Sequence, residues 1–181
     1  MNMNDDPRAT LIKPSTIRFE RLLPGPLERV WAYLVESNKR ATWLAAGEFD
    51  LRVGGKIELI FNNNQLSDEA QPAGAPGSGT RRFEGRITRL EPMKLLAHTW
   101  DWDGKPSDVI YELAPRGKDV LLTIRHNLPE DAGLLRGVGG GWATHVGILE
   151  DQLKGAKPRP FFSTHAREMK DFEQGLAEAR V

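Results

Sequence analysis

The chain has 181 residues, 39% of them hydrophobic and 28% charged, which predicts one soluble globular domain with a short additional segment. Its 25 basic residues balance 25 acidic ones, so the net charge gives no reason to expect a nucleic acid as partner. The sequence contains no cysteine, which excludes disulfides, thiolate metal sites and cysteine nucleophiles.

The first segment is polar and predicts a flexible tail over residues 1–14. It lacks the basic flank and the apolar run of a secretory signal. Nowhere does the sequence approach the ~20 consecutive apolar residues that a membrane span needs. We therefore expect a cytoplasmic protein without membrane insertion.

A strand and two short helices are predicted to follow the tail. Residues 15–23 alternate between apolar and polar side chains, with Ile17, Phe19 and Leu23 on one face, as in a half-buried strand. Pro26 suits the first turn of a helix, because its missing N–H would have no partner there. Apolar residues at helical spacing follow it: Leu27, Val30, Trp31 and Leu34. A second short helix is expected around residues 39–44 and carries Trp43.

Six further strands are predicted where the apolar period changes to two. Residues 49–53 and 57–61 form the first pair, joined by a turn at Gly54-Gly55 that permits positive φ. Residues 62–80 are polar, rich in Gly and Pro and without periodicity, which predicts a mobile insertion. Four more strands follow at short spacing, with apolar residues over 83–87, 96–102, 109–113 and 120–124. Strands joined by short turns predict one antiparallel sheet in an α+β fold.

A glycine run precedes the last helix predicted for this domain. Trp142, Val146, Leu149 and Leu153 fall within one narrow arc of a helical wheel, and His145 flanks that stripe. Four of residues 137–141 are glycine, but the Lys and Ser/Thr of a phosphate-binding loop are missing after them. We interpret the run as a sharp, flexible turn that acts as a gate beside the helix.

A family resemblance rests on several stretches taken together: FDLRVGGKIEL, FEGRITRLEPMKLLAHTWDWD and GGGWATHVGILEDQL. In this order they resemble bacterial proteins related to the C-terminal domain of the activator of heat-shock protein 90 ATPase, within the START-like (SRPBCC, birch-pollen-allergen-like) superfamily. The resemblance covers residues 15–153. It implies a helix-grip fold, in which a curved seven-stranded antiparallel sheet wraps around a long C-terminal helix. Two short helices follow the first strand, and a hydrophobic cavity lies between sheet and helix.

Two segments depart from the family pattern around the expected domain of residues 15–155. The first is the insertion 62–80. The second is a C-terminal extension over residues 156–181, in which Ser163 or Thr164 suits a helix N-cap. Met169, Phe172 and Leu176 follow at helical spacing and predict an added helix. Its apolar edge is expected to pack on the domain or on a second copy in a homodimer.

The resemblance implies binding of an apolar small molecule, such as a lipid or an aromatic metabolite. Residues predicted to face inward form the candidate cavity: Trp43, Phe49, Phe61, His98, Trp100, Tyr111, His126, Trp142, His145, Val146 and Leu149. Their pattern suits an aromatic-lined pocket with a few polar groups. The four histidines of the chain lack metal-ligand spacing, so no metal and no cofactor is assigned.

Two alternatives to non-enzymatic binding stay open at this point. The first is a co-chaperone or stress-response protein that uses the outer surface of the sheet to contact a chaperone. The second is an enzyme resembling a polyketide cyclase or a hydrolase, with His98, His126 or Tyr111 as acid or base. No residue is assigned as catalytic, because the sequence contains no nucleophile motif.

Overall fold

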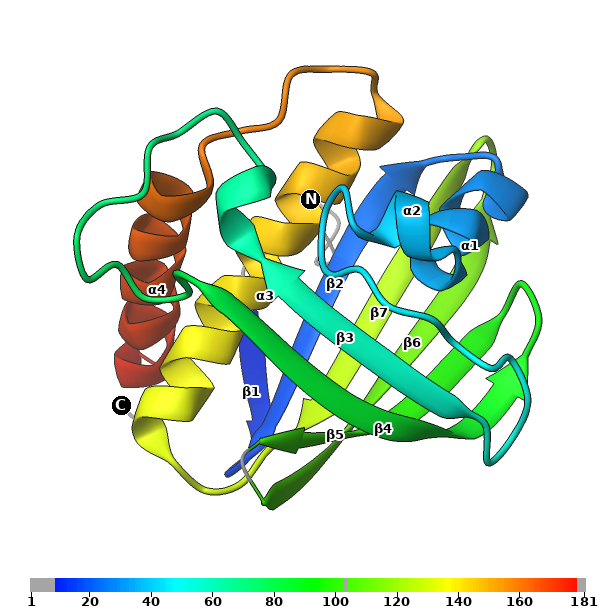
Figure 1. The fold of residues 1–181 in the computed structure, drawn as a ribbon, viewed down its shortest axis with the longest axis horizontal. Coiled ribbons are helices and arrows are strands. Elements are labelled where there is room, and N and C mark those ends of the chain that lie inside the picture. The colour runs from blue at the N-terminus through cyan, green and yellow to red at the C-terminus, as the bar shows by residue number, and fades with distance from the viewer. Residues whose placement is uncertain (1–8, 103, 179–181) are drawn as a thin grey trace.

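The computed structural model describes residues 9–102 and 104–178, and its strands form one antiparallel sheet in the order β1-β2-β7-β6-β5-β4-β3 (Figure 1). This arrangement confirms the α+β helix-grip fold with seven strands. The strands run over Thr10–Lys13 (β1), Thr16–Pro24 (β2), Lys56–Asn62 (β3), Thr80–Glu91 (β4), Leu95–Trp102 (β5), Lys105–Arg116 (β6) and Asp119–Asn127 (β7).

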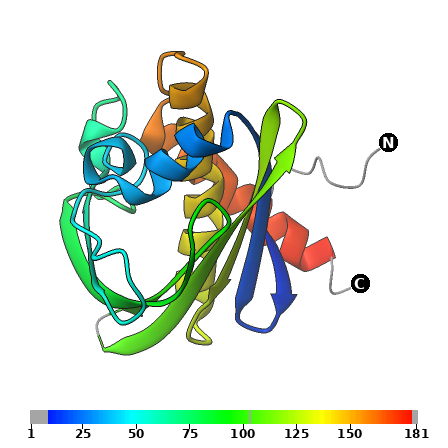
Figure 2. The ribbon, with the colours of Figure 1, turned by 90° about the vertical axis from the view of Figure 1, so that its right-hand side faces the viewer.

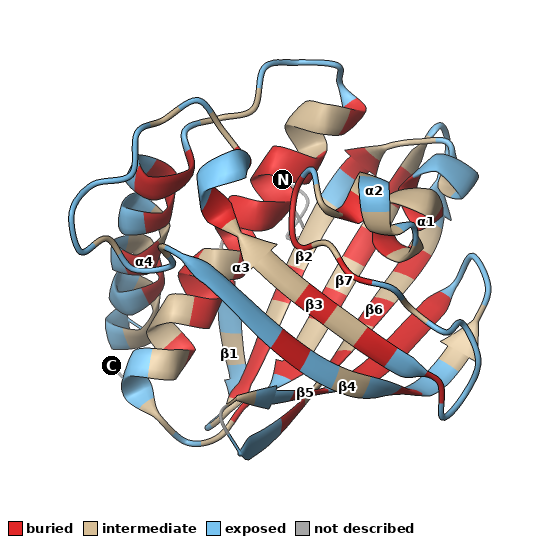
Figure 3. Ribbon diagram, in the orientation of Figure 1, coloured by how far each residue is buried: buried red, intermediate tan, exposed pale blue. Residues whose placement is uncertain are grey.

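The sheet buries one face against a long helix, α3 (Ala132–Leu153), around which it curves (Figure 2). Strand alternation determines this face, because successive side chains point to opposite sides. On β7, for example, Val120, Leu122, Ile124 and His126 are all buried. Figure 3 shows the buried residues gathered on the strands and on α3 where the two face each other. The hydrophobic core therefore lies between sheet and helix.

Two short helices, α1 (Leu27–Val35) and α2 (Ser37–Arg40), are held together by the buried guanidinium of Arg40. It donates hydrogen bonds of 3.1 and 3.0 Å to the carbonyl oxygens of Leu34 and Val35, and a further one to Gly47. A positive charge at the carboxyl end of α1 also suits the helix dipole. Arg40 thus satisfies two carbonyl groups that the end of α1 would otherwise leave without partners, and one of the loop that follows α2.

The seven strands are not the same seven that the sequence predicts. Thr10–Lys13, expected in the flexible tail, forms β1 and pairs with β2, while the rest of that tail up to residue 8 lies outside the described residues. Residues 49–53 form no strand: only Phe49 bridges to Ile57, and Leu51 and Val53 are exposed. The chain turns tightly there, with Arg52 N–H donating to the Asp50 carbonyl at 2.7 Å. The predicted hairpin strand was wrong because local turn bonds replace the strand ladder.

The glycine run lies inside α3 and not in a turn before it, which corrects the interpretation from sequence. The helix begins earlier, where the Asp131 carboxylate accepts a hydrogen bond of 2.9 Å from the Leu134 N–H. A second long helix, α4 (Phe161–Glu178), packs against the run. A Cβ at Gly139 would lie 2.8 Å from the Phe172 ring, and one at Gly140 would lie 2.7 Å from the Met169 backbone nitrogen. These glycines therefore permit close approach of the two helices.

The predicted C-terminal helix is confirmed as α4, although it begins at Phe161, before the expected caps. Its apolar residues Met169 and Phe172 pack on the domain itself. The insertion caps its first turn: the Phe161 N–H donates to the Ser67 hydroxyl at 3.0 Å, and the Ser163 N–H to a Glu69 carboxylate oxygen at 3.1 Å. The two segments that depart from the family pattern thus hold each other. None of the described helices is long and apolar enough to span a membrane.

Candidate ligand-binding cavity

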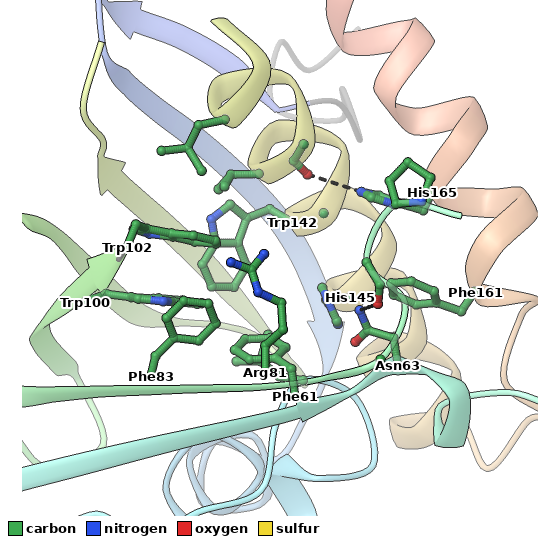
Figure 4. A pocket seen from close by; sticks show the side chains of 18 of the residues that line it. Phe61, Asn63, Arg81, Phe83, Trp100, Trp102, Trp142, His145, Phe161 and His165 are labelled. Carbon is green, nitrogen blue, oxygen red and sulfur yellow. Dashed lines mark hydrogen bonds between the residues drawn. The ribbon is translucent and has the colours of Figure 1, made fainter. Parts of the chain in front are cut away.

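A cavity of about 280 Å³ lies between the sheet and the first half of α3 (Figure 4). Its lining comes from β3, β4, β5 and α3, and from the insertion and α4. This volume is near the lower end of the range for small-molecule sites. It suits a ligand of a few rings more than an extended lipid.

One wall of the cavity is aromatic. Trp100 and Trp102 lie two residues apart on β5, so they project from the same face, and their rings stack 5.3 Å apart at 10°. Phe61 of β3 stacks on Trp100 at 5.5 Å and 26°. Phe83 of β4 lies 4.9 Å from Trp102, and the Arg81 guanidinium lies over both of these rings. The wall is therefore a nearly continuous surface of rings across three strands.

The opposite wall is a stripe of glycines on α3. Gly133, Gly137 and Gly141 are spaced by four residues, which places them on one helix face. A Cβ at Gly137 or Gly141 would meet no atom within 4 Å. The missing side chains therefore leave a slot between the helix backbone and the aromatic wall. Trp142 closes its inner end, with its ring 6.1 Å from Trp100 and perpendicular to it.

The insertion and α4 complete the cavity. Pro76 and Gly77 of the insertion and Phe161 of α4 contribute to the lining. His165 of α4 ties this side to α3, because its Nε2–H donates to the Gly137 carbonyl at 3.2 Å. Access to the cavity therefore depends on two segments outside the family pattern.

His145 is the buried polar side chain of α3 in this cavity. Its Nδ1 lies 2.7 Å from the Trp43 carbonyl oxygen, so Nδ1 carries the proton and Nε2 has a free lone pair. Burial lowers the pKa of His145 to about 4, which keeps the ring neutral at pH 7. The rings of Phe61 and Phe161 flank it at 5.9 and 5.2 Å. His145 therefore presents a neutral hydrogen-bond acceptor in an aromatic surrounding.

Asn63 adds a second acceptor near His145. Its side-chain N–H donates to the Gly77 carbonyl at 2.8 Å, which fixes the orientation of the amide. The side-chain oxygen is buried and finds no donor among the described residues. Figure 4 shows Asn63, His145 and Phe161 grouped at one end of the cavity. The Asn63 oxygen is covered by its surroundings, so His145 is the acceptor with a free lone pair at this end of the lining.

His126, which the sequence offers as an acid or base, has both ring nitrogens occupied by protein groups. Trp142 Nε1–H donates to Nδ1 at 3.2 Å, and Nε2 lies 3.1 Å from the Ser107 hydroxyl oxygen. That hydroxyl donates in turn to the Trp100 carbonyl at 2.5 Å. The bonds fix one tautomer, and burial lowers the pKa of His126 to about 3. His126 is thus a structural link between sheet and α3.

His98 and Tyr111 lie on the same buried face but away from the cavity. The His98 Nδ1–H donates to the Thr99 carbonyl at 2.9 Å, and burial lowers its pKa to about 4. Burial raises the pKa of the Tyr111 hydroxyl. Neither side chain belongs to the cavity lining. Among the described residues, no three His, Asp or Glu side chains come together in a group that could hold a metal ion.

Of the eleven residues predicted for the cavity, four line it: Phe61, Trp100, Trp142 and His145. The other seven lie outside the lining and pack in the core beside or beyond it: Trp43, Phe49, His98, Tyr111, His126, Val146 and Leu149. The lining residues that the prediction missed include Asn63, Phe83, Trp102, Phe161 and His165. Phe83 and Trp102 carried a usable signal, since both lie on predicted inward strand faces. Asn63, Phe161 and His165 carried no such signal, because they come from the insertion and from the C-terminal extension.

Comparison with known proteins places this geometry among related folds. The family model for Activator of Hsp90 ATPase homolog 1-like protein matches residues 24–154. The solution structure of the protein encoded by gene BPP1335 from Bordetella parapertussis has a TM-score of 0.76 and 38% identity, covering 96% of this chain and 94% of that one. This coverage extends over most of α4, which lies beyond the family model. No curated protein matches the chain.

Two further structures are similar in fold alone. The crystal structure of CalU16 from Micromonospora echinospora has a TM-score of 0.68 at 23% identity, with 89% of this chain and 88% of that chain covered. DynU16, from the dynemicin biosynthetic locus, has a TM-score of 0.64 at 20% identity, covering 80% of this chain and 49% of that chain. Both comparisons agree with the sheet and helix arrangement described above.

Proposed function

The chain belongs to the family of activator of Hsp90 ATPase homolog 1-like proteins, and from this premise we propose that it is a binding protein for an apolar small molecule held beneath α3. The single observation that carries the proposal is the slot between the glycine stripe and the aromatic wall. Its lining is apolar apart from a few polar side chains, which is the usual composition of a small-molecule site.

The free-energy cost of this slot supports a role in binding. Glycine within a helix costs about 1 kcal/mol relative to alanine, and the stripe places three such residues in α3. An unfilled apolar space costs further stability, because its lining loses packing contacts. A fold that needed α3 only for core packing would be more stable with side chains in the slot. A ligand that occupies the slot would restore these packing contacts and offset the cost.

The chemistry of the lining favours binding over turnover. No Asp, Glu, Ser, Thr, Lys or Tyr belongs to the lining within the described residues. His145 has its pKa lowered to about 4, so its free nitrogen is a weak base at pH 7. Each CH₂ group of a ligand buried here would contribute about 0.8 kcal/mol. After association costs of at least about 4 kcal/mol, a three-ring ligand can therefore approach micromolar affinity, which corresponds to about −8 kcal/mol.

Replacement of Gly141 by leucine is expected to weaken ligand binding at least about 10-fold, because the new side chain occupies the slot. We would titrate the protein with fatty acids, sterols and flavonoids and follow the tryptophan fluorescence, to which Trp100, Trp102 and Trp142 of the lining contribute. Gly175→Leu is the matched control, since Gly175 lies on α4 with open space around it and outside the cavity lining. It should bind as the wild type does. Absence of saturable binding to every ligand, or equal binding by Gly141→Leu, would contradict the proposal.

A further inference from the structure

The shape of the slot selects flat molecules. On one side the Phe61, Trp100 and Trp102 rings stack with small interplanar angles of 26° and 10°. On the other side Gly137 and Gly141 expose helix backbone without side chains. Aromatic groups prefer offset-stacked or edge-to-face contacts with such rings. A flexible alkyl chain gains no such contact and loses rotational freedom on entering the slot.

His145 adds a polar requirement at the end of the slot. Its Nδ1–H is used by the Trp43 carbonyl, and its Nε2 has no partner among the described residues. The unpartnered Nε2 of His98 is covered and His98 lies outside the lining, whereas His145 belongs to the lining. The His145 side chain is itself more than nine-tenths buried. A buried acceptor without a donor costs free energy until a ligand supplies one.

The chemistry of His145 disfavours an anionic head at this end. Nε2 of His145 is an acceptor and cannot donate a hydrogen bond to a carboxylate. The cationic side chain of the lining, Arg81, lies over the Phe83 and Trp102 rings. A carboxylate placed here would lose its hydration without gaining a donor. A hydroxyl group can donate its proton to Nε2, and its oxygen remains neutral. The chemistry of this end therefore distinguishes alcohols and phenols from acids.

We propose that the cavity takes a planar aromatic molecule of two or three rings that carries a hydroxyl group, and that this hydroxyl donates a hydrogen bond to Nε2 of His145. The inference rests on the proposed function, because it assigns the ligand class of the same cavity. The glycine stripe and the aromatic wall select the ring system (Figure 4), and His145 selects the hydroxyl. His145 is therefore the specificity-determining residue.

Isothermal titration with three probes tests the two parts separately. The probes are 2-naphthol, 2-methylnaphthalene, which has the same shape without a donor, and 1-decanol, which has the hydroxyl on a flexible chain. We expect both naphthalenes to bind more tightly than 1-decanol. In His145→Phe, the affinity of 2-naphthol relative to 2-methylnaphthalene should fall about 3- to 10-fold. His145→Gln keeps an acceptor oxygen and should restore the wild-type ratio.

A direct measurement covers the case in which His145→Phe does not fold. The ¹⁵N shift of His145 Nε2 in the wild-type protein should move on addition of 2-naphthol and stay unchanged with 2-methylnaphthalene. An unmoved shift, or an unchanged ratio in a folded His145→Phe, overturns the role of the hydroxyl. Tighter binding of 1-decanol than of either naphthalene overturns the planar class. Both results leave the proposed function standing. The proposed function is contradicted only if the wild-type protein binds none of the three probes and none of the fatty acids, sterols and flavonoids.

Discussion

Acidification from pH 7.5 to pH 5 is expected to lower the free energy of unfolding by about 6 kcal/mol, which is comparable to the whole stability of a typical domain. The main cause is three buried histidines, and His165 adds to it because burial lowers its pKa as well. Burial lowers the pKa of His98 and His145 to about 4 and that of His126 to about 3. In the unfolded chain each would titrate near about 6.5.

The direction follows from which state binds protons. Below pH 6.5 the unfolded chain takes up a proton at each histidine, whereas the folded protein does not until pH 4 or lower. Stability is therefore fully present above pH 6.5 and is lost as the pH falls, by about 1.4 kcal/mol per pH unit for each group. The carboxylates with lowered pKa, such as Asp131 and Asp151, act at lower pH. Between pH 6.5 and pH 5, the histidines thus cause the change in the free energy of unfolding.

The hydrogen bonds of His126 explain why its protonation is incompatible with the fold. Nδ1 accepts the Trp142 Nε1–H, so a proton there would place two donors against each other. Trp142 is one link from α3 to the sheet, with its ring 5.9 Å from His126 and 5.8 Å from Tyr111. Loss of this bond would weaken the packing of α3 on the sheet at this point. We therefore expect acid to disrupt the contact that also forms the inner end of the cavity.

Urea unfolding at intervals from pH 7.5 to 5, followed by circular dichroism, measures the loss. His145→Gln removes one of the three titrating groups and keeps the acceptor chemistry of the side chain. The slope of its stability against pH should therefore be shallower than the wild-type slope by about 1.4 kcal/mol per pH unit, which is the contribution of one histidine. A pKa near 6.5 for His98, His126 or His145 in the NMR spectrum of the folded protein would contradict the prediction, as would stability that is unchanged down to pH 5.

The sequence predicts strands well where alternation meets a continuous partner strand. Phe19 and Leu23 on β2 and Leu122 and Ile124 on β7 are buried as expected, because each strand pairs along its length. Residues 49–53 show the same alternation and form no strand. The difference lies in turn bonds and in the absence of a surface to cover Leu51. Alternation of apolar and polar residues indicates only a tendency to bury one face of the segment. The strand or helix that covers this face comes from elsewhere in the chain.

The cavity was predictable to the extent that one element determines it. The helical wheel places Trp142 and His145 inward, and both line the slot. Val146 and Leu149 fall on the same stripe but pack in the core, because whether an inward residue meets a void depends on the opposite wall. The glycine run was predicted as a turn for a similar reason. Its helix propensity is poor, and the packing of Phe172 that favours helix there is not visible locally.

Substitution of Gly140 by leucine is expected to destabilise the protein by about 3 kcal/mol or more. A Cβ at this position would lie 2.7 Å from the Met169 nitrogen and 2.9 Å from its Cα. These are backbone atoms, so a rotamer change cannot relieve the overlap, and α4 must move away from α3. Displacement of α4 would also withdraw Phe161 and His165 from the cavity. Urea unfolding and amide exchange along α4 measure the two effects, and retention of wild-type protection in α4 would contradict the prediction.

The adjacent substitution separates this packing role from the role in binding. Gly141→Leu introduces the same side chain one residue further along α3, where a Cβ meets open space. Leucine favours the helix over glycine by up to about 1 kcal/mol, so this variant should be at least as stable as the wild type. Gly140→Leu should thus lose α4 docking together with ligand binding, whereas Gly141→Leu should lose binding alone. If the second variant also lost stability, the slot would be packed core, and the glycines on both faces of α3 would serve helix packing only.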